Sequence, residues 1–390
     1  MIATTRPELS VNEPTLYVAL ELGKKDWKLA MTSGFGVEPW LRTVTSGDRR
    51  AVERVLREGR RRVGVPAGAR VMSCYEAGRD GFWIHRALTA LGIANRVVDS
   101  ASIEVNRRAR RAKTDRLDAL KLVRMLVRVC YGEKRVWSEV RVPTVADEAA
   151  RQVSRERTAL RQDRTRLVNQ MRGWLATWGC TLPSRRRGSW WTSLRDWTGA
   201  ELPAEVQARL ARADARRAGL ETQIAELDAQ QQAAVIAAAP STALAQLVQL
   251  KGVATTSASV LLDEGLVWRA FQNRRQIGGL LGFAPTPYDS GESAREQGIS
   301  RAGNARLQAI SIQLAWNWVQ WQPQSALTQW YQANFGQGKR ARRIGIVAVA
   351  RKLVIALWRY VTTGVVPAGA IRKVTSARVG ASHVRGARFA

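Results

Sequence analysis

Two aspartates three residues apart, Asp115 and Asp118, are the residues whose type and spacing point most directly to chemistry. Apolar residues at positions 117, 120, 123 and 127 recur with the period of a helix, and Thr114 is a typical N-cap residue. This spacing puts both carboxylates on one helix face, where they repel each other unless a divalent cation neutralises them. The alternative is a solvated face on which both acids form salt bridges to the surrounding Arg and Lys side chains.

Two further acids are predicted to lie where strands end. Glu76 follows the apolar segment 69–75, and Glu21 lies near the end of the segment 16–22. The carboxyl ends of strands are where α/β sheets present ligands. Acids on two strands and a pair on a later helix match the layout of RNase H-like nucleases and transposases, which use two metal ions. The alternative is that Glu21, or Asp26 nearby, is simply a turn or surface acid.

Histidine and cysteine are too scarce for most other metal chemistry. The chain has only two His, and its three Cys lie far apart with no CxxC spacing. A zinc site or a disulfide framework is therefore not expected. The scarcity of Cys fits a protein of the reducing cytoplasm. A bound metal would need oxygen ligands, which favours Mg²⁺ or Mn²⁺.

A serine beside a glycine, Ser290, is a candidate nucleophile in a predicted loop rich in Gly, Pro and Ser. A serine hydroxyl can attack a phosphodiester, and nearby cations would offset the charge that develops on the phosphate. The alternatives are an ordinary turn at Ser290 and a helix cap at Asn304. The residues after the serine that we expect to contact nucleic acid are Arg295, Arg301, Asn304 and Arg306.

The charge of the chain points to a polyanionic partner. There are 62 Lys and Arg against 32 Asp and Glu, a net charge of +30, and arginine predominates among the basic residues. Arginine grips phosphate with two parallel hydrogen bonds, so nucleic acid is the expected partner. A membrane is not expected, because no run of about 18 uncharged apolar residues occurs. A basic segment supplies further expected contacts with nucleic acid, at Arg107, Arg108, Arg110, Arg111 and Lys113.

The pattern of elements predicts an α/β fold followed by mostly helical structure. Four short strands and three helices are expected before residue 140, because short apolar segments alternate there with helical ones. Two long segments without internal proline, rich in Ala, Arg, Gln and Leu, are typical of a coiled-coil arm. The expected domains are an α/β domain at 1–140, a helical arm with an insertion at 141–240, a mostly helical domain at 241–370 and a basic tail at 371–390.

Taken together, these motifs resemble the DEDD transposases of bacterial insertion sequences of the one-ten type, which are guided by a bridge RNA or seekRNA. The segments KTDRLDA and PTPYDSG, followed by ISRAGNARL, carry the resemblance most specifically, and it extends over roughly residues 16–367. It implies a RuvC-like N-terminal domain and a C-terminal domain with a nucleophilic serine. The implied acids are Glu21, Glu76, Asp115 and Asp118, with Ser290 as the nucleophile.

The resemblance also implies partners for the chain, and the chain departs from the family at one of the acids. A guide RNA encoded by the element would pair with donor and target DNA, and dimers would assemble into tetramers. The first acid of this family is commonly Asp, whereas this chain has Glu21. Three hypotheses follow: an RNA-guided, Mg²⁺-dependent transposase, a junction-resolving nuclease that uses water, and a non-catalytic nucleic-acid scaffold.

Overall fold

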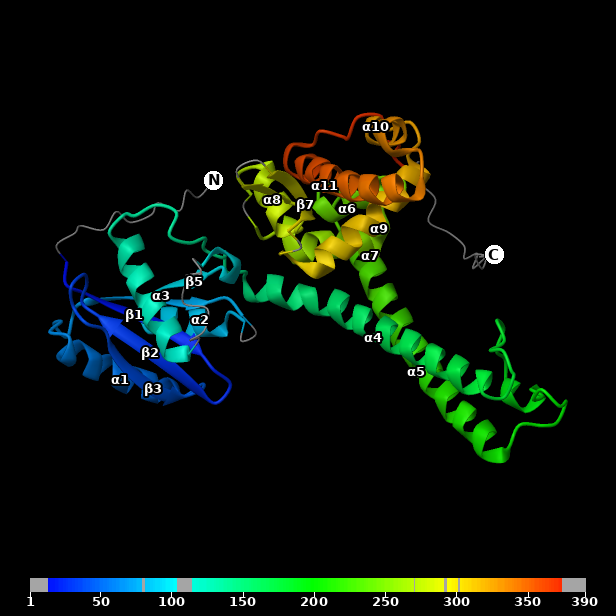
Figure 1. The fold of residues 1–390 in the computed structure, drawn as a ribbon, viewed down its shortest axis with the longest axis horizontal. Coiled ribbons are helices and arrows are strands. Elements are labelled where there is room, and N and C mark those ends of the chain that lie inside the picture. Colours follow the sequence, from blue (N-terminus) through cyan, green and yellow to red (C-terminus); the bar gives the residue numbers. More distant parts are fainter. Residues whose placement is uncertain are drawn as a thin grey trace. The chain divides into compact units, whose positions relative to one another are not determined.

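The computed structural model describes residues 13–78, 81–103, 114–269, 271–290, 293–300 and 302–373 (Figure 1). The fold is mixed α/β, as predicted. The chain divides into two compact units, unit 1 at Met1–Pro143 and unit 2 at Thr144–Ala390. The predicted division of unit 2 into an arm, a helical domain and a basic tail stays a prediction.

Unit 1 contains a five-stranded mixed sheet with the strand order β3-β2-β1-β4-β5. Strands β1, β2 and β3 are antiparallel neighbours, and β4 and β5 run parallel to β1. Its elements are β1 (Thr15–Leu22), β2 (Asp26–Thr32), β3 (Trp40–Thr45), α1 (Arg49–Arg62), β4 (Arg70–Glu76), α2 (Trp83–Ala90), β5 (Ala94–Val98) and α3 (Asp115–Cys130).

The central strand β1 is buried on both faces because helices cover both sides of the sheet. Leu16, Val18 and Leu20 pack with residues of α1 and α2, whereas Tyr17 and Ala19 pack with residues of α3. Successive side chains of a strand point to opposite faces, so an apolar run without alternation is what a strand between two helical layers requires.

The strands and helices predicted before residue 140 are confirmed, with one omission. Strand β3 was not predicted, because half of its side chains are exposed and only Val44 is buried. An edge strand of this kind lacks the apolar pattern on which the prediction depends. The predicted cap of α3 is confirmed, since the Thr114 side chain accepts a hydrogen bond from the Leu117 backbone amide.

Unit 2 begins with two long helices that pack against each other, α4 (Val145–Ala176) and α5 (Ala204–Ala237) (Figure 1). Thr144 and Asp147 form a capping box at the start of α4. The Arg157 guanidinium on α4 pairs with the Asp228 carboxylate on α5, and Arg209 stacks on Trp174 at 3.8 Å.

The remainder of unit 2 is a helical body with its own core, to which Trp318 and Leu353 belong. Helix α11 buries one face because Ile346, Val349 and Leu353 recur at helical spacing. The elements are α6 (Ala243–Gln249), α7 (Thr255–Leu261), the π-helical turn η4 (Leu262–Leu266), α8 (Arg274–Leu280), β6 (Pro285–Ser290), β7 (Ser293–Ile299), α9 (Ala305–Trp321), α10 (Ala326–Phe335) and α11 (Lys339–Thr363). No helix in the described ranges is both long and apolar enough to cross a membrane.

Candidate active site

Two of the predicted acids lie side by side at one edge of the sheet. Leu20 of β1 is in register with Tyr75 of the parallel strand β4, so Glu21 and Glu76 are the next residues along two adjacent strands. Both continue the alternation of Tyr17, Ala19, Met72 and Cys74, which face α3. The two carboxylates therefore belong to the same face at the carboxyl ends of β1 and β4.

Helix α3 brings the other two acids to this edge. The ring of Tyr131, directly after α3, lies 6.4 Å from the ring of Tyr17 near the start of β1. In the middle of the helix, the Cys74 thiol contacts the Leu122 carbonyl oxygen at 3.8 Å. The helix thus runs opposite to β1 and β4, and its first turn, with Asp115 and Asp118, lies toward the strand ends that bear Glu21 and Glu76.

The site is accessible to solvent but its acids are not drawn together. Asp115 is exposed, whereas Glu21, Glu76 and Asp118 are half-buried. Within the described ranges, no three acidic, His or Cys side chains are close enough to share one metal ion. Like charges oppose a closer approach of the carboxylates, and a divalent cation would favour it. An all-carboxylate set of donors suits Mg²⁺ or Mn²⁺.

The predicted serine lies in a β-hairpin rather than in a loop. Ser290 is the last residue of β6 and pairs with Ser293, the first residue of β7. The prediction of a loop was wrong because Gly, Pro and Ser were taken as signs of irregular structure, although the backbone on either side forms an antiparallel ladder. Arg295 belongs to β7, in register with Tyr288.

Several predicted contacts with nucleic acid lie outside the described residues, and their role stays a prediction. They are Arg107, Arg108, Arg110, Arg111, Lys113 and Arg301.

Asn304 and Arg306 have partners inside unit 2. The Asn304 side chain caps α9, accepting hydrogen bonds from the backbone amides of Arg306 and Leu307, and it also donates to Glu264 at 3.1 Å. The Arg306 guanidinium pairs with Glu264 at 3.2 Å and donates to the Ser154 carbonyl oxygen at 2.9 Å. The alternative reading of Asn304 as a helix cap is confirmed, and a contact of either residue with nucleic acid stays a prediction.

The adjacent acids Asp263 and Glu264 of η4 are not among the predicted site residues. Glu264 is buried and accepts two hydrogen bonds from Arg155 of α4, at 2.8 and 3.0 Å. Burial works to raise the pKa of Glu264, but Arg155, Asn304 and Arg306 outweigh it and lower the pKa. Burial, then the charge of Glu264, raise the pKa of Asp263 to about 7. The sequence signal that could have indicated these buried acids is their position within the apolar segment LLDEGL.

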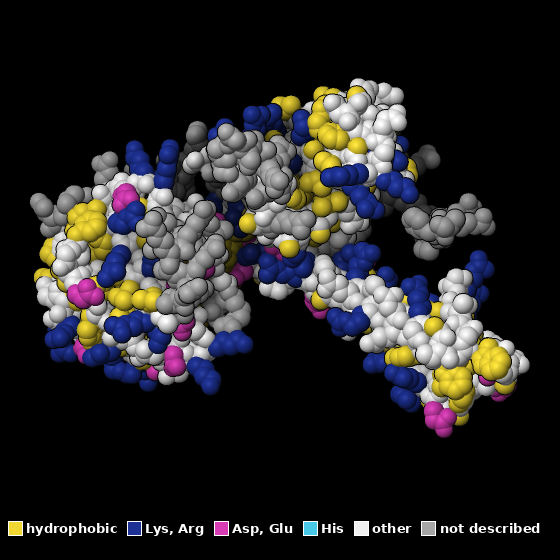
Figure 2. All heavy atoms as spheres, in the orientation of Figure 1, with side chains coloured by type: hydrophobic (Ala, Val, Ile, Leu, Met, Phe, Trp, Pro, Cys, Tyr) yellow, Lys and Arg dark blue, Asp and Glu magenta, His cyan; other side chains and the backbone are white. Residues whose placement is uncertain are grey.

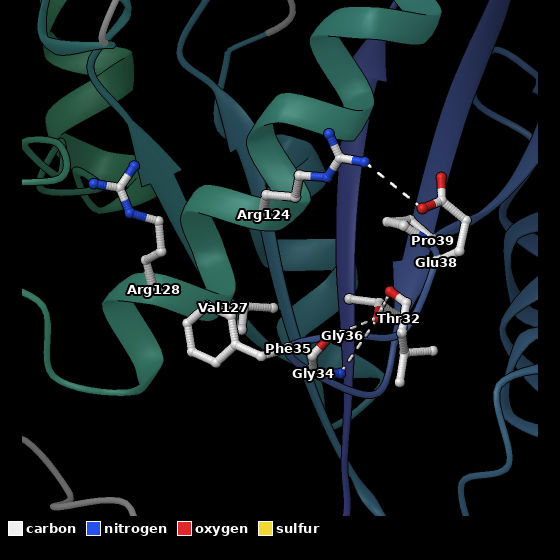
Figure 3. A pocket seen from close by; sticks show the side chains of 10 residues that line it. Thr32, Gly34, Phe35, Gly36, Glu38, Pro39, Arg124, Val127 and Arg128 are labelled. Carbon is white, nitrogen blue, oxygen red and sulfur yellow. Dashed lines mark hydrogen bonds and ion pairs between the residues drawn. The ribbon is translucent and has the colours of Figure 1, made fainter.

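A hollow of about 390 Å³ lies at the other end of α3 (Figure 3). It is lined by Thr32, residues 34–39, Arg124, Val127 and Arg128. The exposed Phe35 ring packs edge-on against Tyr131, and Arg124 lies 3.8 Å from Glu38. None of the four acids lines this hollow, so it is separate from the candidate active site.

Known proteins similar to this chain are transposases by name. The profile of the Transposase IS116/IS110/IS902 family matches residues 244–330, which include the β6–β7 hairpin. "Putative transposase y4rJ" of Sinorhizobium fredii is 40% identical over 397 residues, which cover 96% of this chain and 99% of that protein.

Two more distant relatives match shorter stretches. "Putative transposase y4qE" of the same organism is 28% identical and covers 74% of each chain. "Probable family 20 transposase" of Pseudomonas aeruginosa is 28% identical over 56% of this chain and 65% of its own length. With an identity of 40% along nearly its whole length and a match to the family profile, this chain belongs to the IS116/IS110/IS902 transposase family.

Proposed function

We propose that the protein cuts and rejoins DNA strands by means of metal-binding carboxylates in unit 1 and a serine nucleophile in unit 2. The observation that carries the proposal is that Glu21, Glu76 and the first turn of α3 lie toward the same edge of the sheet. The strand order, with three antiparallel strands followed by two parallel ones, supports an RNase H-like fold for unit 1.

The four acids would hold Mg²⁺ or Mn²⁺, since their donors are all carboxylate oxygens. Such an ion would offset the charge of a phosphodiester and polarise its P–O bonds. Asp115 and Asp118, in the first turn of a capped helix, are held by its backbone. Because Glu21 and Glu76 extend from adjacent strands, their backbones are fixed by the hydrogen bonds of the sheet.

Ser290 would exchange DNA strands in two transesterification steps. Its Oγ attacks the phosphorus, forming a P–O bond to serine as the P–O bond to one sugar oxygen breaks. The proton of the serine leaves to a base, and the departing sugar oxygen takes up a proton. A hydroxyl of another strand would then attack the phosphorus and lose its proton, forming a new P–O bond as the P–O bond to serine breaks. The serine oxygen takes up a proton, which restores Ser290, and the DNA is rejoined. The position of Ser290 within the segment that matches the family supports this role.

An RNA encoded by the element would choose the donor and target DNA, as the family resemblance implies. The charge of +30 supports binding of both nucleic acids. Lys and Arg side chains are spread over the visible surface of each unit (Figure 2). The helix pair α4–α5 is the element we assign to assembly of the dimer and tetramer, as a coiled-coil arm.

Trapping of a covalent adduct tests the nucleophile. Protein, cognate RNA and labelled DNA are mixed with Mg²⁺ and separated under denaturing conditions. The wild type and the control Ser293→Ala should give a DNA adduct, and Ser290→Ala should give none. Cleavage without any adduct in the wild type would instead support a junction-resolving nuclease that uses water. If Asp118→Asn exchanged strands at the wild-type rate, the proposed role of the acids would be wrong.

A further inference from the structure

A row of side chains crosses the sheet at the candidate active site and changes from acidic to basic. Glu21 of β1 is paired with Lys28 of β2, and Lys28 is paired with Thr43 of β3. With Glu76 on the other side of Glu21, the row reads acid, acid, lysine, threonine. Ala30 and Leu41 pack with α3, so Lys28 and Thr43 belong to the same face of the sheet as the acids.

The basic end of this row opens into a hollow of about 250 Å³. It is lined by Lys28, Leu41, Arg42, Thr43 and Arg116. The cations come from three elements, since Lys28 belongs to β2, Arg42 to β3 and Arg116 to α3. Arg116 directly follows Asp115, so the hollow adjoins the acids at the start of the helix as well as across the sheet.

Two of these three cations are available for a ligand. Arg42 pairs with Glu58 at 3.2 Å and stacks on Trp40 at 4.2 Å. Lys28 and Arg116 form no ion pair with any residue in the described part of the chain. Lys28 lies opposite Glu21 in the register of β1 and β2. Two like charges facing one hollow repel each other, and an anion between them would remove that repulsion.

We propose that Lys28 and Arg116 bind a backbone phosphate of the DNA strand that is cut, next to the phosphate at the acids. This proposal rests on the proposed function, because it takes the acids as the place where a phosphodiester is held. Adjacent β-strands lie about 4.8 Å apart, so Lys28 is the first side chain next to the acids that a DNA strand running along this row would contact. The Thr43 hydroxyl can donate a further hydrogen bond to phosphate.

Binding without divalent cations tests the proposal independently of catalysis. The affinity of full-length Lys28→Gln/Arg116→Gln for a DNA duplex is measured in EDTA over a range of salt concentrations. Each lost phosphate contact lowers the slope of log K against log salt by about 0.9, so the double variant, which loses one such contact, should lose about 0.9 from the slope. Affinity at low salt should fall by about tenfold or more.

The matched control is Arg50→Gln/Arg54→Gln, which removes two exposed charges from α1 on the other face of the sheet. It should leave the slope within about 0.5 of the wild type. In a separate measurement on the wild type, DNA should protect Lys28 from amine-reactive labelling and leave the exposed Lys134 reactive. This arm needs no variant, so it stands even if the double variant fails to fold.

Two results would overturn the proposal: a slope equal to that of the control, or full labelling of Lys28 in the DNA complex. Because the acids are intact and Mg²⁺ is absent, these measurements do not depend on whether Ser290 forms an adduct. An adduct with normal binding by the double variant would leave the proposed function standing and reject this phosphate site.

Discussion

Glu21 has one methylene more than the aspartate that is common at this position among the transposases that the chain resembles. Its Oε2 atom is shielded from solvent at the edge of the sheet, beside the strand that bears Glu76. If Glu21 is a metal ligand, its charge is essential and its length is adjustable.

Glu21→Asp should retain strand exchange to within about tenfold, and Glu21→Gln should lose more than about 100-fold, because a neutral amide is a poor ligand for Mg²⁺. Single-turnover assays with cognate RNA and DNA measure both. Asp26→Asn is the control, since Asp26 is exposed as the first residue of β2. Equal activity of Glu21→Gln and the wild type would remove Glu21 from the metal site.

At the scale of elements, Glu264 joins η4 to two helices. It pairs with Arg155 of α4 and with Arg306 of α9, the helix that follows the β6–β7 hairpin. Only the Glu264 carboxylate is buried, since Arg155 is exposed and Arg306 half-exposed. Glu264→Gln removes the charge that these cations pair with and should destabilise unit 2 by about 1–3 kcal/mol. Denaturant unfolding measures the change. Glu226→Gln, an exposed acid on α5, should change stability by less than about 0.5 kcal/mol.

Asp263 should make the stability of unit 2 fall as the pH rises, which is the opposite of what an acid in an ion pair does. Its pKa, about 7 in the folded chain, lies above its ordinary value, so between about pH 4 and pH 7 the folded state keeps a proton that the unfolded state has lost. This contribution to stability falls as pH rises through that window. Asp263→Asn should therefore raise the melting temperature relative to wild type more at pH 8 than at pH 5. An equal difference at both pH values would contradict the raised pKa.

For the whole molecule, the boundary between Pro143 and Thr144 separates two units that have their own cores. It cuts no helix, because Thr144 is the cap of α4. A fragment of residues 1–143 should fold alone and unfold cooperatively, since its sheet is covered on both faces by its own helices. Thermal circular dichroism tests this, and a broad transition without cooperativity would show that unit 1 needs the remainder of the chain.

The sequence alone determined the helices and buried strands of unit 1, the two long helices α4 and α5, the cap at Thr114 and the family of the chain. These features depend on local periodicity and on short motifs, which are readable without knowledge of distant neighbours. It also named the acids, because carboxylates at strand ends and in pairs are informative by type. Edge strand β3 and the β6–β7 hairpin were not predicted, because they are stabilised by backbone hydrogen bonds, which do not produce a pattern of apolar side chains in the sequence.

Only the tertiary structure decided which residues are neighbours. Glu21 and Glu76 are far apart in the sequence and adjacent in the sheet, because β4 pairs with β1 instead of with β3. Lys28 joins their row through the β1–β2 register. Likewise, Asn304 and Arg306 have a buried partner, Glu264, that no local pattern indicates. Strand order and packing are long-range choices, set by burial summed over the whole unit, so single residues do not reveal them.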